Sequence, residues 1–448
     1  MYLVLILVAV IAFVVIATSR YKLHPFITLL LAAYGTALLA GMPITDIAKT
    51  ISGGFGGILG YIGLVIILGT VIGTILEKSG AAITMADTII QVLGQRFPKL
   101  TMSIIGYFVS IPVFCDSGYV ILNSLKKSLG KRLNVSAVGM SVALATGLYA
   151  THTFVPPTPG PIAAAGNLGL MDNLGLVIGL GLIVAACTAG TGLLWASKGT
   201  KGLTCEEDDE VTVNYDDLKA QYGELPSPAK AFSPILIPIF LICLASIANY
   251  PTHPFGEGSL QTVLQFLGAP LNALMMGLGL AITLIKGVQR VSQFTDLVGK
   301  GILACAPILL ITGAGGAFGR VLAATEIGTY LGEALSTLGL GIFMPFLVAA
   351  ALKTAQGSST VALVTTSALV APMVGDIGLA SEMGRALTVL AIGAGAMTVS
   401  HANDSFFWVV SQFSKMSVST AYRAQTMATL IQGVTGIVVV YIMSLVLL

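Results

Sequence analysis

Asp116 is the residue in this sequence whose presence is hardest to explain by packing. It lies in the segment Pro112–Gly118, inside an apolar stretch of the chain. A charged side chain at the centre of a bilayer costs at least about 2.5–3.5 kcal/mol, so such residues usually carry protons or ions. Asp116 therefore predicts a proton-coupling carboxylate, with Ser117 and Gly118 beside it as candidate substrate contacts. An Asp that caps the backbone N–H groups of a following helix is the alternative.

A second polar cluster, Ser400–Ser405, interrupts another apolar region. It brings His401, Asn403 and Asp404 together among apolar neighbours. Imidazole and amide groups offer donors to a carboxylate and acceptors to hydroxyl groups. We therefore predict that His401 and Asn403 contact substrate and that Asp404 is a second candidate for proton coupling. The simpler alternative is a helix N-cap formed by Asn403 or Asp404.

The segment Thr151–Pro161 contains four prolines within six residues and cannot form a continuous helix. Thr151, His152 and Thr153 open this break, and we predict that they contact substrate. Histidine can also change charge near neutral pH, which suits a transport site. A proline-rich surface loop, or a structural histidine held by hydrogen bonds, would explain the same pattern.

Gln356–Thr360 is a fourth polar interruption of an apolar region. Gly357 permits a tight turn. The hydroxyl groups of Ser358, Ser359 and Thr360 are suited to a carboxylated or polyhydroxylated ligand. The sequence therefore predicts four substrate contacts at this tip, although serine-rich turns also cap helices without binding anything.

The composition places these clusters in a membrane protein. Of the 448 residues, 55% are hydrophobic and 9% are charged, whereas a soluble domain has about 25% charged residues. This excludes a water-soluble enzyme, and the net charge of only +2 argues against a nucleic-acid binder. The sequence has no phosphate-binding loop, zinc-binding helix or serine-hydrolase elbow, and its five cysteines have no metal spacing. We therefore expect no catalytic residue, no cofactor and no metal site.

The apolar segments predict an all-α polytopic fold, since a spanning helix needs about 20 apolar residues. A mixed stretch at 81–97 predicts a helix at the membrane interface. Each half of the chain also has two interrupted regions, which we interpret as a re-entrant hairpin followed by a discontinuous span: 100–125 and 134–170, then 340–373 and 386–412. Uninterrupted spans are predicted at 2–18, 25–42, 56–76, 174–196, 232–250, 264–285, 301–323 and 425–447.

Charge predicts the orientation of these segments. The first apolar segment has its basic residues after it, so we interpret it as an uncleaved span and not as a signal peptide. In the resulting threading, most of the 22 basic residues fall on the cytoplasmic side. Arg320 on the outer side either attracts anions at a vestibule or extends to the membrane surface. The basic residues predicted outside are Lys49, Arg320, Lys353 and Arg385.

The two halves of the chain share one order of elements. The spacing between the breaks at His152 and His401 is close to the spacing between the hairpin glycines Gly118 and Gly357. An odd number of crossings in each half would insert the second half upside down, as in secondary transporters with inverted repeats. The predicted parts are a first membrane repeat at 1–197, a solvated acidic cytoplasmic linker at 198–230 and an inverted second repeat at 231–448.

Three segments have a more specific pattern: Ala150–Pro161, Gly357–Ala362, and Ser400–Asp404 followed by Trp408. With these segments the sequence resembles the gluconate permease family of bacterial proton symporters over nearly its whole length. The resemblance implies an elevator-like ion-transporter fold in the inner membrane. It also implies uptake of a small sugar acid or hydroxy acid with protons. Asp116 stands where family members tend to carry Glu and Thr158 where His is frequent, so gluconate, glycerate and D-serine-like acids all stay candidates.

We therefore expect a secondary transporter and not an enzyme, with the two hairpin tips meeting the two breaks near the middle of the membrane. Its expected partners are an anionic sugar acid or hydroxy acid, a proton, the lipid bilayer and a second copy in a homodimer, but no nucleic acid. Two alternatives stay open. One is a sodium-coupled carboxylate carrier, and the other is an intramembrane hydrolase that uses Asp116, Asp404 or a histidine.

Overall fold

The computed structural model describes residues 23–448 except 95, 210–222, 249–253, 257, 287–288, 326–339 and 402–403, together with scattered positions among the first 22. Every regular element in this part of the chain is helical, which confirms the all-α prediction. The predicted first span, 2–18, lies mostly outside the described residues. The α-helices are α2 Pro25–Leu39, α3 Ile44–Lys78, α4 Ala81–Leu93, α5 Pro98–Val109, α6 Cys115–Arg132, α7 Ala137–Phe154, α8 Pro159–Asn167, α9 Leu174–Lys198, α11 Pro228–Ala248, α12 Ser259–Gly268, α13 Pro270–Ile282, α14 Arg290–Ala323, α16 Phe343–Gln356, α17 Ser359–Val370, α18 Glu382–Met397, α19 Ser405–Phe413, α20 Val418–Ala421 and α21 Met427–Leu447.

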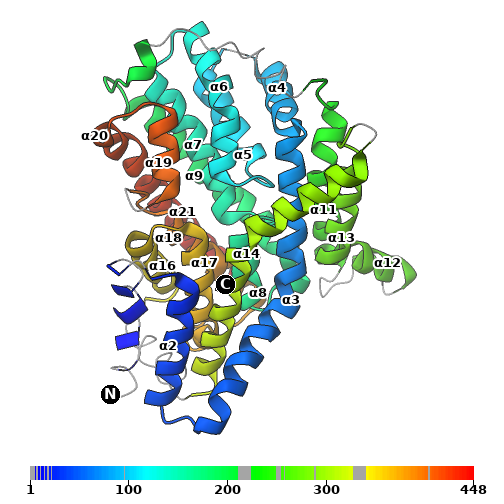
Figure 1. Ribbon diagram of the computed structural model, residues 1–448, viewed down its shortest axis with the longest axis vertical. Helices are drawn as coiled ribbons and strands as arrows, with labels where there is room; N and C mark the ends of the chain where they lie inside the picture. The colour runs from blue at the N-terminus through cyan, green and yellow to red at the C-terminus, as the bar shows by residue number, and fades with distance from the viewer. Residues whose placement is uncertain are drawn as a thin grey trace.

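The helices pack in two groups (Figure 1). The frame helices are α2, α3, α11, α13 and α14, in which α3 packs along α14 and both α2 and α13 pack against this pair. The core helices are α5 to α9 and α16 to α21, in which α7 packs on α5, α6 and α9, and α18 packs on α16 and α21. The two halves of the chain interlock, because α8 packs on α17, α9 on α21 and α3 on α14. The inverted relation between the halves stays a prediction.

The four predicted interruptions are all helix breaks. Residues 110–114 separate α5 from α6, and residues 155–158 separate α7 from α8. Gly357 and Ser358 separate α16 from α17, and residues 398–404 separate α18 from α19. The turn at Gly357 has a φ of +90°, a conformation that L side chains rarely adopt. The helices α5, α16 and α17 have 12, 14 and 12 residues, which is about 18–21 Å and too short to cross the hydrocarbon core.

Six helices among the described residues are long and apolar enough to cross a membrane. The prediction of one continuous span at 264–285 is wrong, because α12 and α13 meet there at 64°. Pro270 in the first turn of α13 has no N–H group to continue the hydrogen bonds of α12, and Ala269 before it has an extended backbone. The helices α3 and α14 begin about three turns before the predicted spans at 56 and 301.

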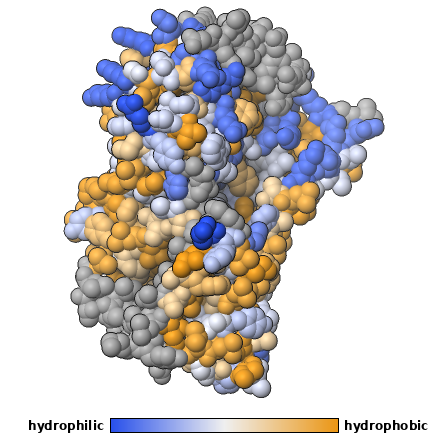
Figure 2. All heavy atoms as spheres, turned by 60° about the vertical axis from the view of Figure 1, so that its left-hand side comes forward, coloured by the Kyte–Doolittle hydropathy of each residue, from blue (hydrophilic) through white to orange (hydrophobic). Residues whose placement is uncertain are grey.

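The surface is apolar over most of one face, and hydrophilic residues gather at one end (Figure 2). Large apolar side chains such as Leu303 (74% exposed) and Val446 (78% exposed) lie on this surface. Exposed apolar surface on this scale is expected of a protein whose surroundings are lipid. We call the hydrophilic end the polar end; it holds the C-terminal turns of α6 and the short 3₁₀ helix η2 (Glu206–Asp209).

Candidate functional site

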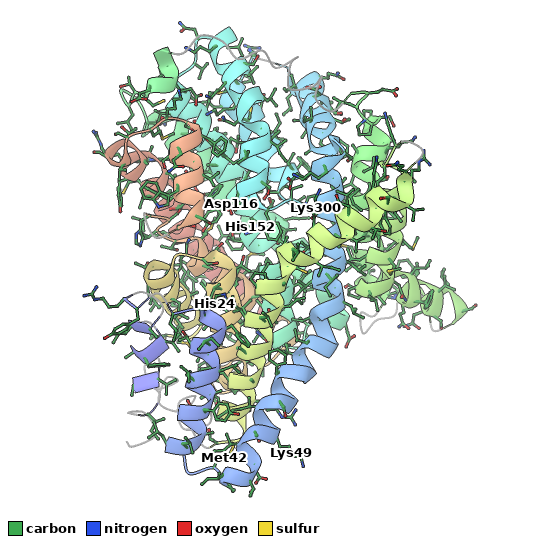
Figure 3. The ribbon with its side chains drawn as sticks, viewed as in Figure 1. His24, Met42, Lys49, Asp116, His152 and Lys300 are labelled. Atoms are coloured by element: carbon green, nitrogen blue, oxygen red, sulfur yellow. The ribbon has the colours of Figure 1, made fainter. Side chains whose placement is uncertain are left out.

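Three of the four interruptions contribute residues to one cavity of about 230 Å³ in the middle of the molecule, and the last turns of α7, just before the remaining interruption, also line it. Asp116 and His152 lie close together there, far from Met42 and Lys49 at the opposite end from the polar end (Figure 3). Six predicted site residues line this cavity: Asp116, His152, Ser358, Ser359, Thr360 and Asp404. The other lining residues are Phe114, Cys115, Tyr149, Pro307, Ile308, Ile311, Val361, Val364, Ser405 and Phe406.

Asp116 lies in the first turn of α6, immediately after the tip of the first hairpin. The helix begins without a side-chain cap, so Asp116 is not the N-cap that the alternative interpretation expected. Its Oδ1 atom is buried and has no hydrogen-bond partner in the described part of the chain. The carboxyl group interacts with the charges of Asp404 and Lys353, with the N–H of its own residue and with the hydroxyl of Ser405.

His152 and Tyr149 project from the last turns of α7 toward the cavity. The ring of His152 stacks on Tyr149 with 6.4 Å between the centroids and lies 5.9 Å from the ring of Phe114. Within the described structure, Nδ1 of His152 has no hydrogen-bond partner, and Oη of Tyr149 lies near the hydroxyl of Ser359 but forms no hydrogen bond with it, although both atoms are buried. A buried polar atom without a partner is costly, so these groups are available to a polar ligand.

The second hairpin presents hydroxyl groups to the cavity. Ser358 is the N-cap of α17 and its Oγ accepts a hydrogen bond from the N–H of Val361 at 3.3 Å. Ser359 and Thr360 follow in the first turn of the same helix and also line the cavity. Gly357 lies behind them and provides the turn, and its carbonyl accepts a hydrogen bond from Lys353.

Lys353 is a functional candidate that the sequence did not identify. It was predicted to face the outside, but its side chain is fully buried in α16. Its Nζ donates to Oδ2 of Asp404 at 2.6 Å and lies 5.9 Å from the centre of the Tyr149 ring. The signal that could have revealed it is a single lysine among apolar residues in a short hairpin arm, where burial demands a partner.

Asp404 has a structural role as well as its ion pair. It is the N-cap of α19, and its Oδ1 accepts a hydrogen bond from the N–H of Phe406 at 3.1 Å. Its Oδ2 also accepts a hydrogen bond from the hydroxyl of Ser400 at 2.5 Å. The helix N-cap that the sequence suggested as an alternative is therefore confirmed at Asp404, and the same residue also lines the cavity.

The remaining predicted contacts lie elsewhere. Ser117, Gly118, Thr151, Thr153, Gly357 and His401 are not among the cavity-lining residues. The hydroxyls of Thr151 and Thr153 donate to the carbonyls of Tyr107 and Tyr149. A Cβ at Gly118 would approach Leu148 at 2.8 Å, so this glycine allows α6 to pack on α7. Nε2 of His401 lies 3.0 Å from the carbonyl of Thr354, and Asn403 lies outside the described residues.

The part of the chain that the structure describes contains no group of three or more His, Cys, Asp or Glu residues arranged to hold a metal ion. The cavity instead combines one unpaired carboxylate, one ion pair, several hydroxyl groups and an apolar wall. This combination suits the reversible binding of a small polar solute.

Comparison with known proteins agrees with this architecture. The family model described as GntP family permease matches residues 1–446. The chain belongs to the GntP permease family. Over 445 residues this permease is 35% identical to the gluconate permease of Pseudomonas aeruginosa, covering 98% of this chain and 97% of the relative. It is 32% identical over 445 residues to the D-serine transporter DsdX of Escherichia coli, with 98% and 97% covered.

The fold of this GntP permease is also found in a solved structure. The YdaH transporter of Alcanivorax borkumensis, described as having an unusual topology, matches with a TM-score of 0.69 at 13% identity. The match covers 95% of this chain and 99% of that one, so the two proteins share a fold. The family match and the apolar helices make the chain a multi-pass inner-membrane transporter.

Proposed function

We propose that this permease takes up gluconate or a related small hydroxy acid together with protons, and that the central cavity is its binding site. The observation that carries the proposal is that three residues lining one cavity, Asp116, His152 and Tyr149, each have a buried polar atom that makes no hydrogen bond in the described structure: Oδ1, Nδ1 and Oη respectively. A ligand with several hydroxyl groups would supply the missing hydrogen bonds. The cavity is smaller than the roughly 300–1,000 Å³ of drug-sized sites, which suits a compact solute.

The substrate carboxylate has a natural place in this cavity. Three helices begin at the cavity wall: α6 at Cys115, α17 at Ser359 and α19 at Ser405. The N-terminus of α6 has no side-chain cap, so its backbone N–H groups and the positive end of its dipole favour an anion, whereas α17 and α19 are already capped by Ser358 and Asp404. The charge of Lys353 is already balanced by Asp404, so the N-terminus of α6 and hydroxyl groups would bind the carboxylate.

Asp116 is the better candidate for the coupled proton. Asp404 is held by Lys353, by the Ser400 hydroxyl and by the N–H of Phe406, so its protonation would break several contacts at once. Asp116 has a buried oxygen atom without such contacts in the described structure. Its protonation would remove a negative charge next to the incoming anion, and this would link the binding of proton and substrate.

Transport also requires that the cavity open to the two sides of the membrane in turn. The cavity lies between the core helices and α14 of the frame, which contributes Pro307, Ile308 and Ile311. These side chains offer no hydrogen-bonding groups that would hold the core in one position. We propose that the core helices move against the frame as one body, with the two halves of the chain as inverted repeats.

Uptake into proteoliposomes tests this proposal. Purified permease would be reconstituted with an imposed pH gradient and supplied with labelled gluconate, glycerate or D-serine. We expect accumulation of at least one of these acids above its external concentration, and its loss on adding an uncoupler. Accumulation that persists with the uncoupler but requires sodium instead of choline would replace proton coupling with sodium coupling. Turnover of the solute to a product without accumulation would contradict transport.

A further inference from the structure

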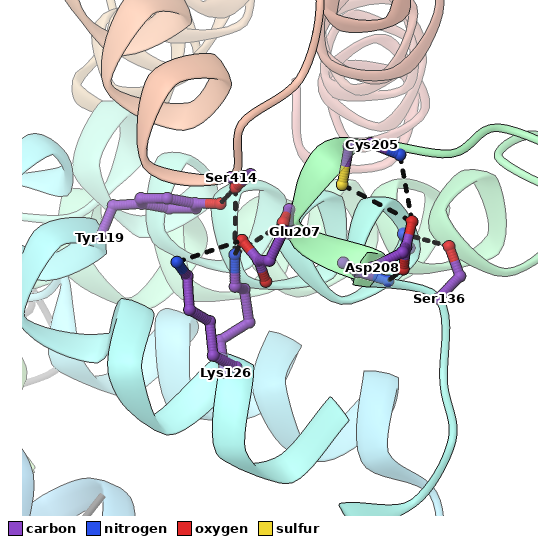
Figure 4. Close-up of polar contacts among 11 residues, drawn as sticks. Tyr119, Lys126, Ser136, Cys205, Glu207, Asp208 and Ser414 are labelled. Carbon is purple, nitrogen blue, oxygen red and sulfur yellow. Dashed lines mark hydrogen bonds and ion pairs between the residues drawn. The ribbon is translucent and has the colours of Figure 1, made fainter. Parts of the chain in front are cut away.

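A second buried ion pair lies at the polar end, well away from the cavity. The short helix η2 (Glu206–Asp209) follows α9 and lies against the C-terminal turns of α6, the start of α7 and the turn between α19 and α20 (Figure 4). The sequence predicts a solvated linker here, and Glu206 is indeed exposed. Glu207 differs, because only 2% of it is exposed.

Lys126 of α6 is the nearer of two lysines beside Glu207, since Nζ of Lys127 lies 4.0 Å from the same carboxylate oxygen. Nζ of Lys126 donates to Oε2 of Glu207 at 2.8 Å, and the two side chains are 0% and 3% exposed. The same Nζ donates to Oγ of Ser141 at 2.9 Å and to Oγ of Ser414 at 3.1 Å. A short hydrogen bond of 2.5 Å links Ser414 to Oη of Tyr119 (Figure 4). One ammonium group thus joins the linker, α6, α7 and the end of α19.

Backbone contacts hold the same turn in place. Oδ1 of Asp208 accepts a hydrogen bond from the N–H of Ala137 at 2.9 Å, and its carbonyl accepts one from Lys131 at 2.6 Å. The N–H of Glu206 donates to the carbonyl of Lys415 at 3.3 Å. Burial raises the pKa of the neighbouring Cys205 thiol to about 11, and the negative charge of Asp208 adds to this increase. The thiol is therefore protected while the turn is docked.

The helices joined at the polar end are the helices that shape the cavity. Lys126 lies ten residues after Asp116 on α6, about 15 Å along the helix. Tyr119, which contacts Ser414, also packs edge-on against Phe406 at 6.2 Å. Phe406 in turn stacks on Tyr149 at 5.1 Å, and both of these residues line the cavity. A continuous series of packed side chains therefore connects the linker turn to the binding site.

We propose that Glu207 and Lys126 are positioning residues for transport. The turn Cys205–Asp208 acts as a clasp that ties α6 to α7 and α19, and so fixes how far Asp116 stands from Asp404 across the cavity. This part of the inference rests on the proposed transport function. The docking of the turn itself does not rest on it. In the second hairpin, α17 has no charged residue that could form a corresponding ion pair.

The first test concerns the clasp alone and uses no substrate. The rate of maleimide labelling of Cys205 would be measured in membranes by peptide mass spectrometry, which separates it from the other four cysteines. We expect Glu207→Gln to label at least tenfold faster than the wild type. Glu206→Gln is the matched control, since it removes the same charge from an exposed neighbour, and we expect its rate to match the wild type. Equal rates in both variants would overturn the clasp.

The second test concerns positioning. We expect Glu207→Gln to raise the KM of the transported acid about fivefold at an equal amount of folded protein, because the first turn of α6 is no longer held. Replacing both charges, in Lys126→Met with Glu207→Met, should be less harmful than Lys126→Met alone, because no unpaired charge is left buried. An unchanged KM with only less folded protein would make the pair merely structural and overturn the positioning role.

A milder variant keeps the test decisive if Glu207→Gln does not fold. Ser414→Ala removes the hydroxyl that joins Lys126 to Tyr119 but leaves the ion pair intact. We expect about a twofold rise in KM and little change in Cys205 labelling. Failure of the wild type to transport any of the acids would refute the proposed function, whereas the labelling result would still decide whether the clasp exists.

Discussion

The two hairpins of this permease differ in where their ion pairs lie relative to the hairpin tip. In the first hairpin the ion pair of Lys126 and Glu207 lies at the polar end, while Asp116 at the tip has a buried oxygen atom without a hydrogen-bond partner in the described structure. In the second hairpin the ion pair of Lys353 and Asp404 lies directly behind the tip, and the tip itself carries only hydroxyl groups. One cavity is thus bounded by the carboxylate of Asp116 and by that of Asp404, whose charge Lys353 balances.

A proton-coupled carrier needs both a rigid support for its binding site and a group that exchanges a proton, and this difference assigns one of these roles to each hairpin. Losing one partner of a buried ion pair costs about 3–5 kcal/mol, so the pair behind the second tip is a fixed support. A carboxylate without such a partner can gain and lose a proton with little rearrangement, which suits the first tip. The hairpins therefore look alike in their order of elements but not in their electrostatics. Each prediction below tests this contrast, from the largest expected effect to the smallest.

Lys353→Met should have the largest effect, because it leaves the carboxylate of Asp404 buried without its cation. We expect a loss of about 3–5 kcal/mol in stability and no measurable uptake. Thermal unfolding of the purified protein and uptake into proteoliposomes would measure both. Lys300→Met is the control, since Lys300 pairs with Asp296 at 2.7 Å on the exposed surface, where a pair contributes only about 0–1 kcal/mol. Equal losses in the two variants would contradict a supporting role for Lys353.

Asp116→Asn should abolish proton-driven accumulation, at least tenfold, while the protein stays folded. The amide has nearly the same shape but cannot change its charge, so exchange of labelled for unlabelled substrate should continue without a gradient. Counterflow and gradient-driven uptake in the same vesicles would separate these outcomes. Accumulation near the wild-type level would remove Asp116 from the coupling role and return attention to Asp404.

Ser358→Ala should have a smaller effect that is confined to binding. Ser358 and Ser381 are both N-caps that accept one backbone hydrogen bond, from Val361 and Gly384, but only Ser358 lines the cavity. We expect both alanine variants to lose about 0.5–2 kcal/mol in stability and only Ser358→Ala to raise KM, by about threefold. A KM that rises equally in Ser381→Ala would show that the cap, and not the hydroxyl in the cavity, is responsible.

Sequence reasoning predicted where the chain is interrupted better than what each residue does there. Proline, glycine and polar residues break an apolar helix through local backbone chemistry, so all four breaks could be expected. Pro270 could have predicted a break in the same way. The apolar residues around it led to the prediction of a continuous span, so the bend between α12 and α13 was missed.

The partners of buried charges could not be predicted in the same way. Lys353 was placed outside because the hairpin at 340–373 was threaded as opening outward, and nothing local points to its partner, which is 51 residues away. Glu207 is one of several consecutive acids, and nothing local distinguishes it from the exposed Glu206. Both burials depend on tertiary packing. For the same reason, Thr151 and Thr153 were predicted beside His152 as site residues although their hydroxyls bond to backbone carbonyls.

The wall that α14 contributes has a consequence for stereochemistry. Pro307, Ile308 and Ile311 present only carbon to the cavity, whereas other lining residues offer carboxylate, imidazole and hydroxyl groups. A hydroxyl turned toward α14 would lose its water without gaining a hydrogen bond, which is unfavourable. We therefore expect epimers of one sugar acid to be transported unequally, and competition between such epimers would reveal which carbon of the solute faces the frame.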